Sequence, residues 1–225
     1  MPGRYFITTT TSARYSMFPE DFSRECISTV FERPRYNIAP SQTAPVLRVI
    51  DGELVASDMR WGFAPRWMKD ASKAQINARS ETVFEKRMFQ QAAKTQRCLV
   101  PTSGWYEWQP VAAGKQAWAL HLEDFEPFAF AGLWTVGNNA EGGPEENFLT
   151  LTAEPSAQIA AIHHRMPVIL DAEGCKLWLD PAATQEQLTP LLASWREPLV
   201  LRRVSSKVNS PKNHGPECLE EVKGG

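Results

Sequence analysis

One stretch of the chain decides the fold, and it reads Val46-Leu47-Arg48-Val49-Ile50-Asp51-Gly52-Glu53-Leu54-Val55-Ala56-Ser57-Asp58-Met59-Arg60-Trp61. Two strand-like runs, residues 46–50 and 54–61, flank the dipeptide Asp51-Gly52. Such a pair favours the tight turn between antiparallel strands, because both residues tolerate a left-handed backbone. The stretch therefore predicts a β-hairpin, and with it an antiparallel sheet.

Outward from this hairpin, many apolar runs are short and rich in β-branched and aromatic residues, which is typical of strands. We expect further strands at residues 5–10, 97–100, 105–108, 116–122, 128–136, 148–152 and 199–204. Residues 32–45 carry three prolines and should form a structured loop, not a helix. Residues 137–147 should form a flexible acidic loop.

Five segments are candidates for helices: residues 12–22, 83–94, 155–161, 172–179 and 184–194. In the second of them, Phe84, Met88 and Ala92 recur every four residues, as on one face of a helix. The first has Thr11 or Ser12 as a candidate N-cap.

The order of these elements predicts the fold class. Strands and helices do not alternate regularly, and no Gly-rich phosphate loop follows a strand, so a nucleotide-binding parallel sheet is disfavoured. We predict one α+β domain over residues 1–225, with a curved, mostly antiparallel sheet or partly closed barrel and peripheral helices. The turn-rich tail from about residue 210 is expected to be flexible.

Composition excludes several other classes of protein. Hydrophobic residues make up 43% of the 225 residues and charged residues 22%, which are ordinary values for a globular protein. No apolar run approaches the roughly 20 residues of a membrane span, and we expect no signal peptide. The net charge of −2 argues against a general polyanion binder but is compatible with a local basic groove.

The cysteines give no sign of a metal site or of disulfides. Cys26, Cys98, Cys175 and Cys218 lie far apart and form no Cys-x-x-Cys pair, which fits a reducing cytoplasm. We expect no metal and no cofactor. A Gly-x-Ser-x-Gly motif is also missing, so a standard serine or thiol hydrolase has little support.

The first two residues offer a nucleophile. A small residue after Met1 usually leads to removal of the initiator, which would expose the secondary amine of Pro2. An α-amino group titrates near pH 8, and its neutral form can attack an aldehyde to give an iminium. The alternative is that Pro2 is one more disordered terminal residue.

Glu107 is a candidate acid or base. In a strand, Trp105 and Glu107 would face one way and Tyr106 and Trp108 the other. A carboxyl group beside a large aromatic side chain has its pKa raised by desolvation, which produces a general acid near neutral pH. The alternative is a solvent-facing glutamate on an edge strand.

His163 and His164 are adjacent, so only one can face a given site if the segment is extended. Histidine is the side chain most easily tuned to transfer a proton near pH 7. The alternative is a surface or structural histidine, and without a third ligand nearby the pair is weak evidence for a metal.

Three further polar or aromatic positions suggest binding. Asn37 and Asn77 each lie near an arginine, Arg35 and Arg79, and such pairs can hold sugar hydroxyls and phosphates. Trp67 lies in an aromatic loop with basic neighbours, the usual platform for single-stranded bases. Each amide could instead be a turn residue, and Trp67 a hydrophobic plug over the sheet.

Taken together, seven stretches resemble the SOS-response-associated peptidase (SRAP) family. In family order they are Gly3-Arg4-Tyr5, Arg35-Tyr36-Asn37-Ile38-Ala39-Pro40, Trp61-Gly62-Phe63-Ala64-Pro65 through Trp67, Ile76-Asn77-Ala78-Arg79-Ser80-Glu81-Thr82, Gly104-Trp105-Tyr106-Glu107-Trp108, Ile162-His163-His164-Arg165-Met166-Pro167 and the tail from Val208-Asn209. The resemblance implies a barrel-like sheet with a positively charged groove. It also implies recognition of abasic sites in single-stranded DNA and a DNA–protein crosslink.

The resemblance further implies roles for single residues. Asn77 is similar to the asparagine that holds the crosslinked sugar, Glu107 to the catalytic glutamate, and His163 to the histidine that assists opening of the deoxyribose ring. The implied DNA-binding surface consists of Arg4, Asn37, Trp67, Arg79 and Arg165, with Met88 as a wedge beside the abasic gap.

The chain departs from the family pattern at position 2, where the family has a cysteine whose thiol closes a thiazolidine ring. Pro2 has no thiol, so that ring cannot form, but its amine can still form an iminium. An iminium favours β-elimination, the chemistry of an abasic-site lyase. We therefore expect transient Schiff-base chemistry or non-covalent binding.

The expected protein is a cytoplasmic DNA-damage protein, associated with the nucleoid when bound to DNA. Its expected partner is single-stranded DNA with abasic sites, bound by a monomer without a membrane or a metal. Two alternatives remain: a non-catalytic module that protects single-stranded DNA, and a self-processing peptidase, for which Pro2 leaves no evident nucleophile.

Overall fold

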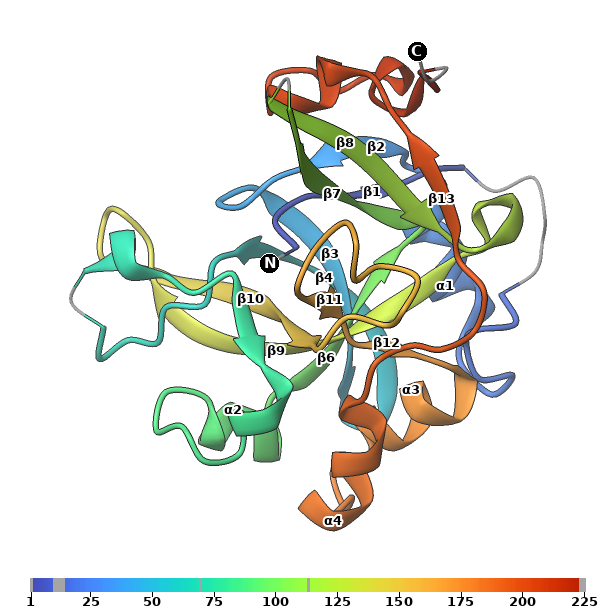
Figure 1. Ribbon diagram of the computed structural model, residues 1–225. Helices are drawn as coiled ribbons and strands as arrows, with labels where there is room; N and C mark the ends of the chain where they lie inside the picture. The colour runs from blue at the N-terminus through green and yellow to red at the C-terminus, as the bar shows by residue number, and fades with distance from the viewer. Residues whose placement is uncertain (1, 10–14, 69, 113, 223–225) are drawn as a thin grey trace.

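Two sheets build the fold, a larger one that closes on itself and a smaller open one (Figure 1). The computed structural model describes residues 2–9, 15–68, 70–112 and 114–222. In Figure 1 the smaller sheet lies above the larger one, and the N mark lies between the two. The start of the chain therefore enters the space where the sheets meet.

The larger sheet is a barrel of five strands: β3 (Thr43–Ile50), β4 (Glu53–Trp61), β6 (Arg97–Thr102), β9 (Phe128–Asn138) and β10 (Pro144–Ala153). They pair in the order β10-β4-β3-β6-β9, and β9 also pairs with β10, which closes the ring. Only the β10–β4 pairing within this ring is parallel. The short strands β5 (Asn77–Arg79) and β11 (Met166–Pro167) pair with β10, and β12 (Ile169–Leu170) pairs with β9.

The predicted hairpin is confirmed as β3–β4, with Ile50 paired to Glu53 across a two-residue turn. Asp51 and Gly52 have φ angles of 52° and 86°, so both adopt the left-handed backbone that such a turn requires. The turn fixes the register of the whole β3–β4 ladder, and with it which side chains face the barrel interior.

The smaller sheet has the order β13-β8-β7-β1-β2 and is entirely antiparallel. Its strands are β1 (Tyr5–Ile7), β2 (Arg35–Ile38), β7 (Gly104–Val111), β8 (Gly114–His121) and β13 (Val200–Arg203). Alternate residues of β1 serve two cores: Tyr5 and Ile7 pack in the main core, and Phe6 packs in a second cluster with Tyr106 and Val208. At Gly104 an added Cβ would lie 2.3 Å from the ring of Phe6, so the close approach of β1 to β7 requires glycine.

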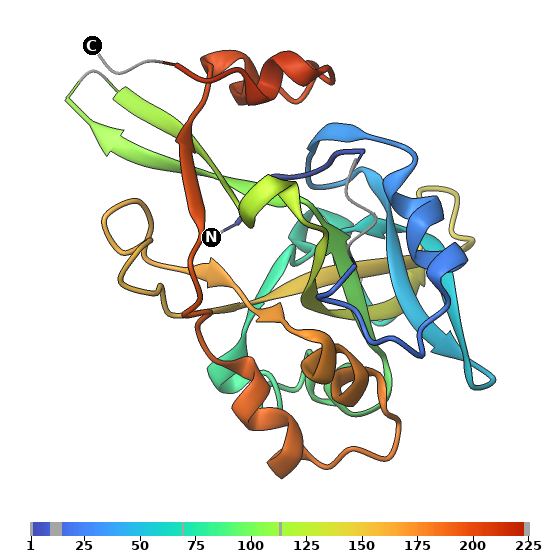
Figure 2. The ribbon, with the colours of Figure 1, turned by 90° about the vertical axis from the view of Figure 1, so that its right-hand side faces the viewer.

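Among the described residues, four α-helices lie at the periphery: α1 (Arg24–Phe31), α2 (Gln90–Thr95), α3 (Ala172–Leu179) and α4 (Gln185–Leu188). Single 3-10 turns complete the described chain, at Ala71–Lys73, Ser80–Thr82, Glu123–Phe125, Thr189–Leu192, Ser206–Asn209 and Pro216–Leu219. Figure 2 shows α3 and α4 at the opposite end of the molecule from the C-terminal turns. The α+β class and the barrel-like sheet predicted from the sequence are confirmed.

Two predicted helices are wrong in position. Residues 15–22 form turns, residues 12–14 lie outside the described residues, and the helix begins after Ser23, whose side chain accepts from the amide of Cys26. Pro19 lacks the amide hydrogen that a helix through residue 19 would need. The helix predicted at 83–94 is confined to Gln90–Thr95, and residues 83–89 form successive turns that still bury Val83 and Phe89.

Four further predictions are corrected by sheet pairing or by turns. Residues 35–38 form strand β2 instead of a loop, and the predicted acidic loop shrinks to residues 139–143 because β9 and β10 extend toward each other. Residues 157–162 form turns instead of a helix. The helix predicted at 184–194 divides into α4 and a 3-10 turn that contains Pro190, while α3 is confirmed at residues 172–179.

Candidate active site at the start of the chain

Pro2 is buried, and the fold holds it there through its main chain. The Asn77 amide nitrogen Nδ2 donates to the carbonyl oxygen of Pro2 at 2.7 Å. The next residues join the smaller sheet, since Tyr5 pairs with Trp105 and the amide of Tyr106 donates to the carbonyl of Arg4 at 3.0 Å. Pro2 is therefore a fixed part of the structure and not a disordered terminal residue.

Asn77 reaches this position from β5, which runs parallel to β10. Its side chain is buried, and the hydroxyl of Thr150 donates to its Oδ1 at 2.5 Å. The side-chain amide of Asn77 is thus held by two hydrogen bonds: its oxygen accepts from Thr150 of β10, and its nitrogen donates to Pro2.

Glu107 is carried by β7, and its register places it next to the start of the chain. Because Tyr5 pairs with Trp105 in an antiparallel ladder, continuing that register places Gly3 opposite Glu107. Glu107 is only 2% exposed, and burial raises its pKa to about 8, so the carboxyl group is protonated at neutral pH. Its Oε1 has no hydrogen-bond partner among the described residues.

His163 lies beside Glu107, with its Nε2 3.9 Å from Oε2 of the carboxyl group. Its other ring nitrogen, Nδ1, lies 3.1 Å from the amide nitrogen of Arg165 and 3.0 Å from that residue's carbonyl oxygen. Desolvation lowers the pKa of His163, so the ring is neutral at physiological pH. The ring of His164 stacks on it at 4.4 Å between centroids.

These four residues form two linked pairs, Pro2 with Asn77 and Glu107 with His163. The first pair immobilises the chain terminus, and the second supplies a protonated carboxyl group beside a neutral imidazole. Addition of an amine to a carbonyl group requires a proton donor when water leaves, and a buried acid near neutrality is suited to that step. The arrangement can therefore support amine chemistry on an electrophilic carbon.

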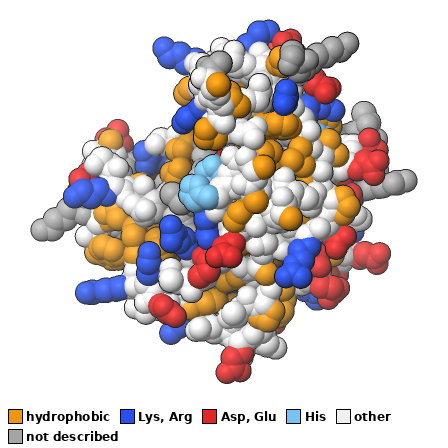
Figure 3. Space-filling model, viewed as in Figure 1, with side chains coloured by type: hydrophobic (Ala, Val, Ile, Leu, Met, Phe, Trp, Pro, Cys, Tyr) orange, Lys and Arg blue, Asp and Glu red, His pale blue; other side chains and the backbone are white. Residues whose placement is uncertain are grey.

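The other predicted site residues divide into surface and interior groups. Trp67 is 64% exposed, Arg79 is exposed, and Met88 is half-buried at the edge of the core. Figure 3 shows histidine side chains near the middle of the face seen in Figure 1, with lysine and arginine side chains below and to the left of them. The predicted binding residues that can reach a ligand directly are thus Trp67, Arg79 and Met88.

Arg4 and Asn37 make their contacts inside the protein. Arg4 donates to Oδ1 of Asn37 at 2.7 Å and to the carbonyl of Val208 at 2.9 Å, and it lies over the ring of Trp108. Asn37 donates in turn to the carbonyl groups of Val208, Ser210 and Asn213. This network ties the C-terminal segment to β1 and β2.

Arg165 is also an interior residue, 6% exposed. Its guanidinium group donates to both carboxylate oxygens of Glu81, at 2.7 and 2.9 Å, and to the carbonyl of Thr152. Sequence reasoning missed Glu81 and Thr150 as partners of site residues. Neither partnership has a signal in the sequence, because each depends on which strands and turns the fold brings together.

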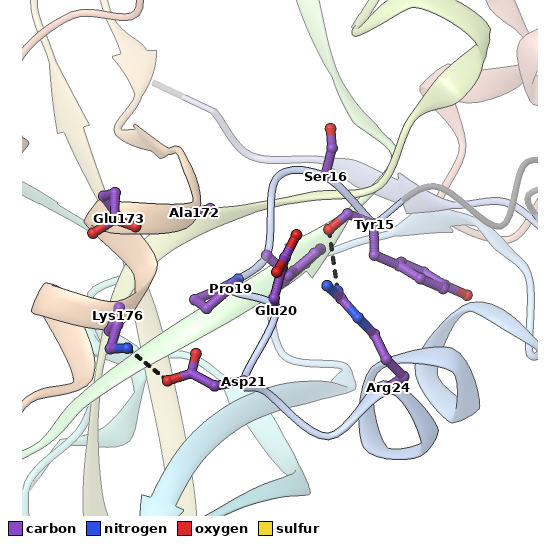
Figure 4. A pocket seen from close by; sticks show the side chains of 10 residues that line it. Tyr15, Ser16, Pro19, Glu20, Asp21, Arg24, Ala172, Glu173 and Lys176 are labelled. Atoms are coloured by element: carbon purple, nitrogen blue, oxygen red, sulfur yellow. Dashed lines mark hydrogen bonds and ion pairs between the residues drawn. The ribbon is translucent and has the colours of Figure 1, made fainter.

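A separate hollow of about 710 Å³ lies between residues 15–24 and α3 (Figure 4). Lys176 binds Asp21 across it at 2.6 Å, and Arg24 donates to the carbonyl of Tyr15. No predicted site residue lines this hollow.

Two features are absent from the described residues: a metal-binding cluster and a helix that could span a membrane. No group of three His, Cys, Asp or Glu side chains in that part of the chain is placed to hold a metal ion. No helix of the described segments is long and apolar enough to cross a bilayer.

The fold and site together define a class: an α+β barrel protein that buries its N-terminal segment next to an asparagine, a glutamic acid and a histidine. The chain belongs to the SOS response associated peptidase (SRAP) family, whose model matches residues 1–211. The resemblance found in the sequence is therefore confirmed.

Relatives in bacteria and vertebrates are similar to the chain over most of its length. The abasic site processing protein YoqW of Bacillus subtilis is 39% identical over 83% of this chain and 86% of its own. The abasic site processing protein HMCES of Gallus gallus is 33% identical over 86% of this chain and 68% of its own. A crystal structure of a Bacteroides thetaiotaomicron protein, 24% identical, shares the fold with a TM-score of 0.76 over 94% of both chains.

Proposed function

We propose that this protein binds abasic sites in single-stranded DNA and reacts with them through the amine of Pro2. The observation that carries the proposal is the buried Pro2, held by Asn77 and followed by a chain segment that runs beside Glu107. The relatives' names supply the substrate class, since YoqW and HMCES are both abasic site processing proteins.

The proposed reaction begins after Met1 has been removed. The amine of Pro2 adds to C1′ of the opened sugar, and a proton moves from nitrogen to oxygen to give a carbinolamine. Glu107 then gives its proton to the hydroxyl group, which leaves as water while the nitrogen lone pair forms the iminium. Glu107 is left as a carboxylate beside the new cation, which favours both charges.

Two fates of the iminium follow from the missing thiol. Loss of a C2′ proton lets the 3′-phosphate leave with the electron pair of its C–O bond, which cuts the strand. Addition of water to the iminium instead restores the aldehyde and frees the amine. In either case Pro2 gives a transient adduct, because no second nucleophile on Pro2 can close a ring.

We further propose that Trp67 and Arg79 hold the strand outside the site. An exposed indole can stack on a base, and an exposed guanidinium group can pair with a phosphate. Met88, at the edge of the core, is proposed to contact the gap left by the missing base. The protein is proposed to act as a single domain and as a monomer, which sedimentation with and without DNA would test.

The test is trapping with borohydride, which reduces an iminium to a stable amine. Purified protein is incubated with a single-stranded oligonucleotide that contains one abasic site, and with the intact strand as control. We expect a covalent adduct only with the abasic strand, carried by the peptide that begins at Pro2. No adduct would overturn the Pro2 chemistry, and equal affinity for both strands would overturn abasic-site recognition.

A non-covalent protective module is the second candidate, favoured by the absence of a thiol at position 2. It predicts that Glu107→Ala and His163→Ala retain full affinity and function. Mass spectrometry of the intact protein separates the candidates further, because a retained Met1 blocks the amine of Pro2.

A further inference from the structure

We infer that Thr150 is a positioning residue of the site, acting on Pro2 through the amide of Asn77; the inference rests on the function proposed above. Thr150 Oγ1 lies 2.5 Å from Asn77 Oδ1, and Asn77 Nδ2 lies 2.7 Å from the carbonyl oxygen of Pro2. The three residues thus form one chain of two hydrogen bonds from β10 to the start of the protein.

The direction of both hydrogen bonds follows from their end members. A main-chain carbonyl can only accept, so the atom of Asn77 that faces Pro2 must be the amide nitrogen. The amide oxygen then faces Thr150, and the hydroxyl must donate to it. Without that donor, the amide oxygen of Asn77 would lose its hydrogen bond to β10, and the amide would be held only through its nitrogen on Pro2.

The strand pairing fixes Thr150 in place. Thr150 and Asn77 are direct partners in the parallel β10–β5 ladder, and the amide of Thr150 donates to the carbonyl of Ile76 at 3.1 Å. Thr150 is 2% exposed and Asn77 6% exposed, so water does not compete freely for either side chain. A buried hydrogen bond of this kind is rigid, which suits a residue that orients another.

The consequence for the reaction lies in where the amine is held. The carbonyl carbon and the amine nitrogen of Pro2 are both bonded to the same Cα atom, so a single rotation, about the Cα–C bond, relates the carbonyl oxygen to the amine. Anchoring the carbonyl therefore restricts the positions open to the nitrogen. Small errors in the placement of a nucleophile reduce the rate of attack more than they reduce substrate binding.

The kinetic test compares variants that keep or remove the hydroxyl group. Thr150→Val removes it at constant shape, and Thr150→Ser retains it. We expect Thr150→Val to lower the rate of borohydride-trapped adduct at saturating abasic DNA by about 5- to 10-fold, the effect of one lost hydrogen bond. Affinity for the abasic strand should stay within about twofold of the parent, and Thr150→Ser should keep the parent rate within about twofold.

Thr8→Val is the matched control, because the hydroxyl of Thr8 is buried and has no partner among the described residues. It should leave the rate unchanged. An equal loss in Thr8→Val, or an equal loss in Thr150→Ser, would overturn the inference. If Thr150→Val does not fold, Thr150→Cys, with its weak donor, serves the same comparison.

A second readout does not depend on DNA. The side-chain amide resonances of Asn77, assigned by their loss in Asn77→Ala, should shift and exchange faster with solvent in Thr150→Val but not in Thr150→Ser. Unchanged resonances in Thr150→Val would overturn the inference whether or not the parent reacts with DNA. A parent that forms no adduct, together with shifted resonances, would overturn the proposed function while leaving the role of Thr150 in orienting Asn77 intact.

Discussion

Arg165 and Glu81 join the two segments that carry the candidate active site. Arg165 Nη1 and Nη2 donate to the two carboxylate oxygens of Glu81 at 2.7 and 2.9 Å. Arg165 lies two residues after His163, and Glu81 lies four residues after Asn77. The ion pair therefore holds the histidine segment against the asparagine segment, and its partners differ in burial: the side chain of Arg165 is 7% exposed and that of Glu81 is 44% exposed.

This difference in burial predicts unequal effects of removing each partner. Glu81→Ala leaves a buried cation with fewer acceptors and should lower the free energy of unfolding by about 2–3 kcal/mol. Arg165→Met leaves the Glu81 carboxylate within reach of water, and the methionine side chain fills the space of the aliphatic part of Arg165. This substitution should therefore lower the free energy of unfolding by less, about 1 kcal/mol. Urea denaturation measures both values, and the reverse order would contradict the prediction. Asp21→Ala, which breaks the exposed pair with Lys176, is the control and should change stability little.

Glu107 predicts an unusual dependence of stability on pH. Burial raises its folded-state pKa to about 8, whereas in the unfolded chain it titrates near its ordinary value. Between those two values the folded protein binds one more proton than the unfolded chain, so stability falls as pH rises from about 4.5 to about 8 and then levels off. The loss is on the order of 5 kcal/mol. Urea titrations across this range should show it in the parent and not in Glu107→Gln.

The protonation of Glu107 also predicts how the rate of adduct formation changes at alkaline pH. If Glu107 donates the proton that leaves with water, the rate of adduct formation should fall as pH rises through about 8. Glu107→Gln should react slowly and lose this fall in rate. A parent profile that keeps rising above pH 9 would assign the proton to another donor.

Replacing Pro2 tests whether the rest of the site is complete. Pro2→Cys restores an amine together with a thiol, so we expect an adduct with abasic DNA that survives heating without borohydride. Pro2→Ala supplies an amine alone and should need borohydride, as the parent does. A heat-stable adduct with Pro2→Ala would show that ring closure is not what stabilises it.

Replacing Arg79 should change the salt dependence of DNA binding. Its exposed guanidinium group is proposed to contact a phosphate, so Arg79→Ala should weaken binding and reduce the slope of log affinity against log salt by about 0.7 for single-stranded DNA. Lys115→Ala removes an exposed charge from the far end of the β7–β8 hairpin and should leave the slope unchanged. Fluorescence anisotropy at several salt concentrations makes the comparison.

Replacing Trp67 should weaken DNA binding without changing the slope of log affinity against log salt. A base stacked on an aromatic side chain contributes about 1–3 kcal/mol, so Trp67→Ala should weaken single-strand binding by about 5- to 150-fold. Val111→Ala, at another exposed hydrophobic position, is the control. Full affinity in Trp67→Ala would instead make Trp67 an exposed side chain without a role in binding.

Local features of the sequence are sufficient to predict several elements of the fold. The Asp51-Gly52 turn required left-handed backbone at two residues, and it is found there. The strand at residues 105–108 directs Trp105 into the main core and Tyr106 and Trp108 into the second, as the alternation of side chains predicts. The helix predicted at residues 12–22 is wrong over residues 15–22, where Pro19 lies, and the helix predicted at 83–94 is confined to Gln90–Thr95, because core packing of residues 83–89 outweighs helical spacing.

By itself, the sequence determined the residue types at the site and the departure at Pro2, because ordered motifs and a missing thiol can be recognised without coordinates. Only the tertiary structure decided which of those residues meet. Burial sets the pKa of Glu107, and strand register places Thr150 on Asn77. The fold also turns Arg4, Asn37 and Arg165 inward, onto main-chain carbonyls and Glu81. Desolvation and contacts between distant segments arise from packing, and no local stretch of sequence specifies them.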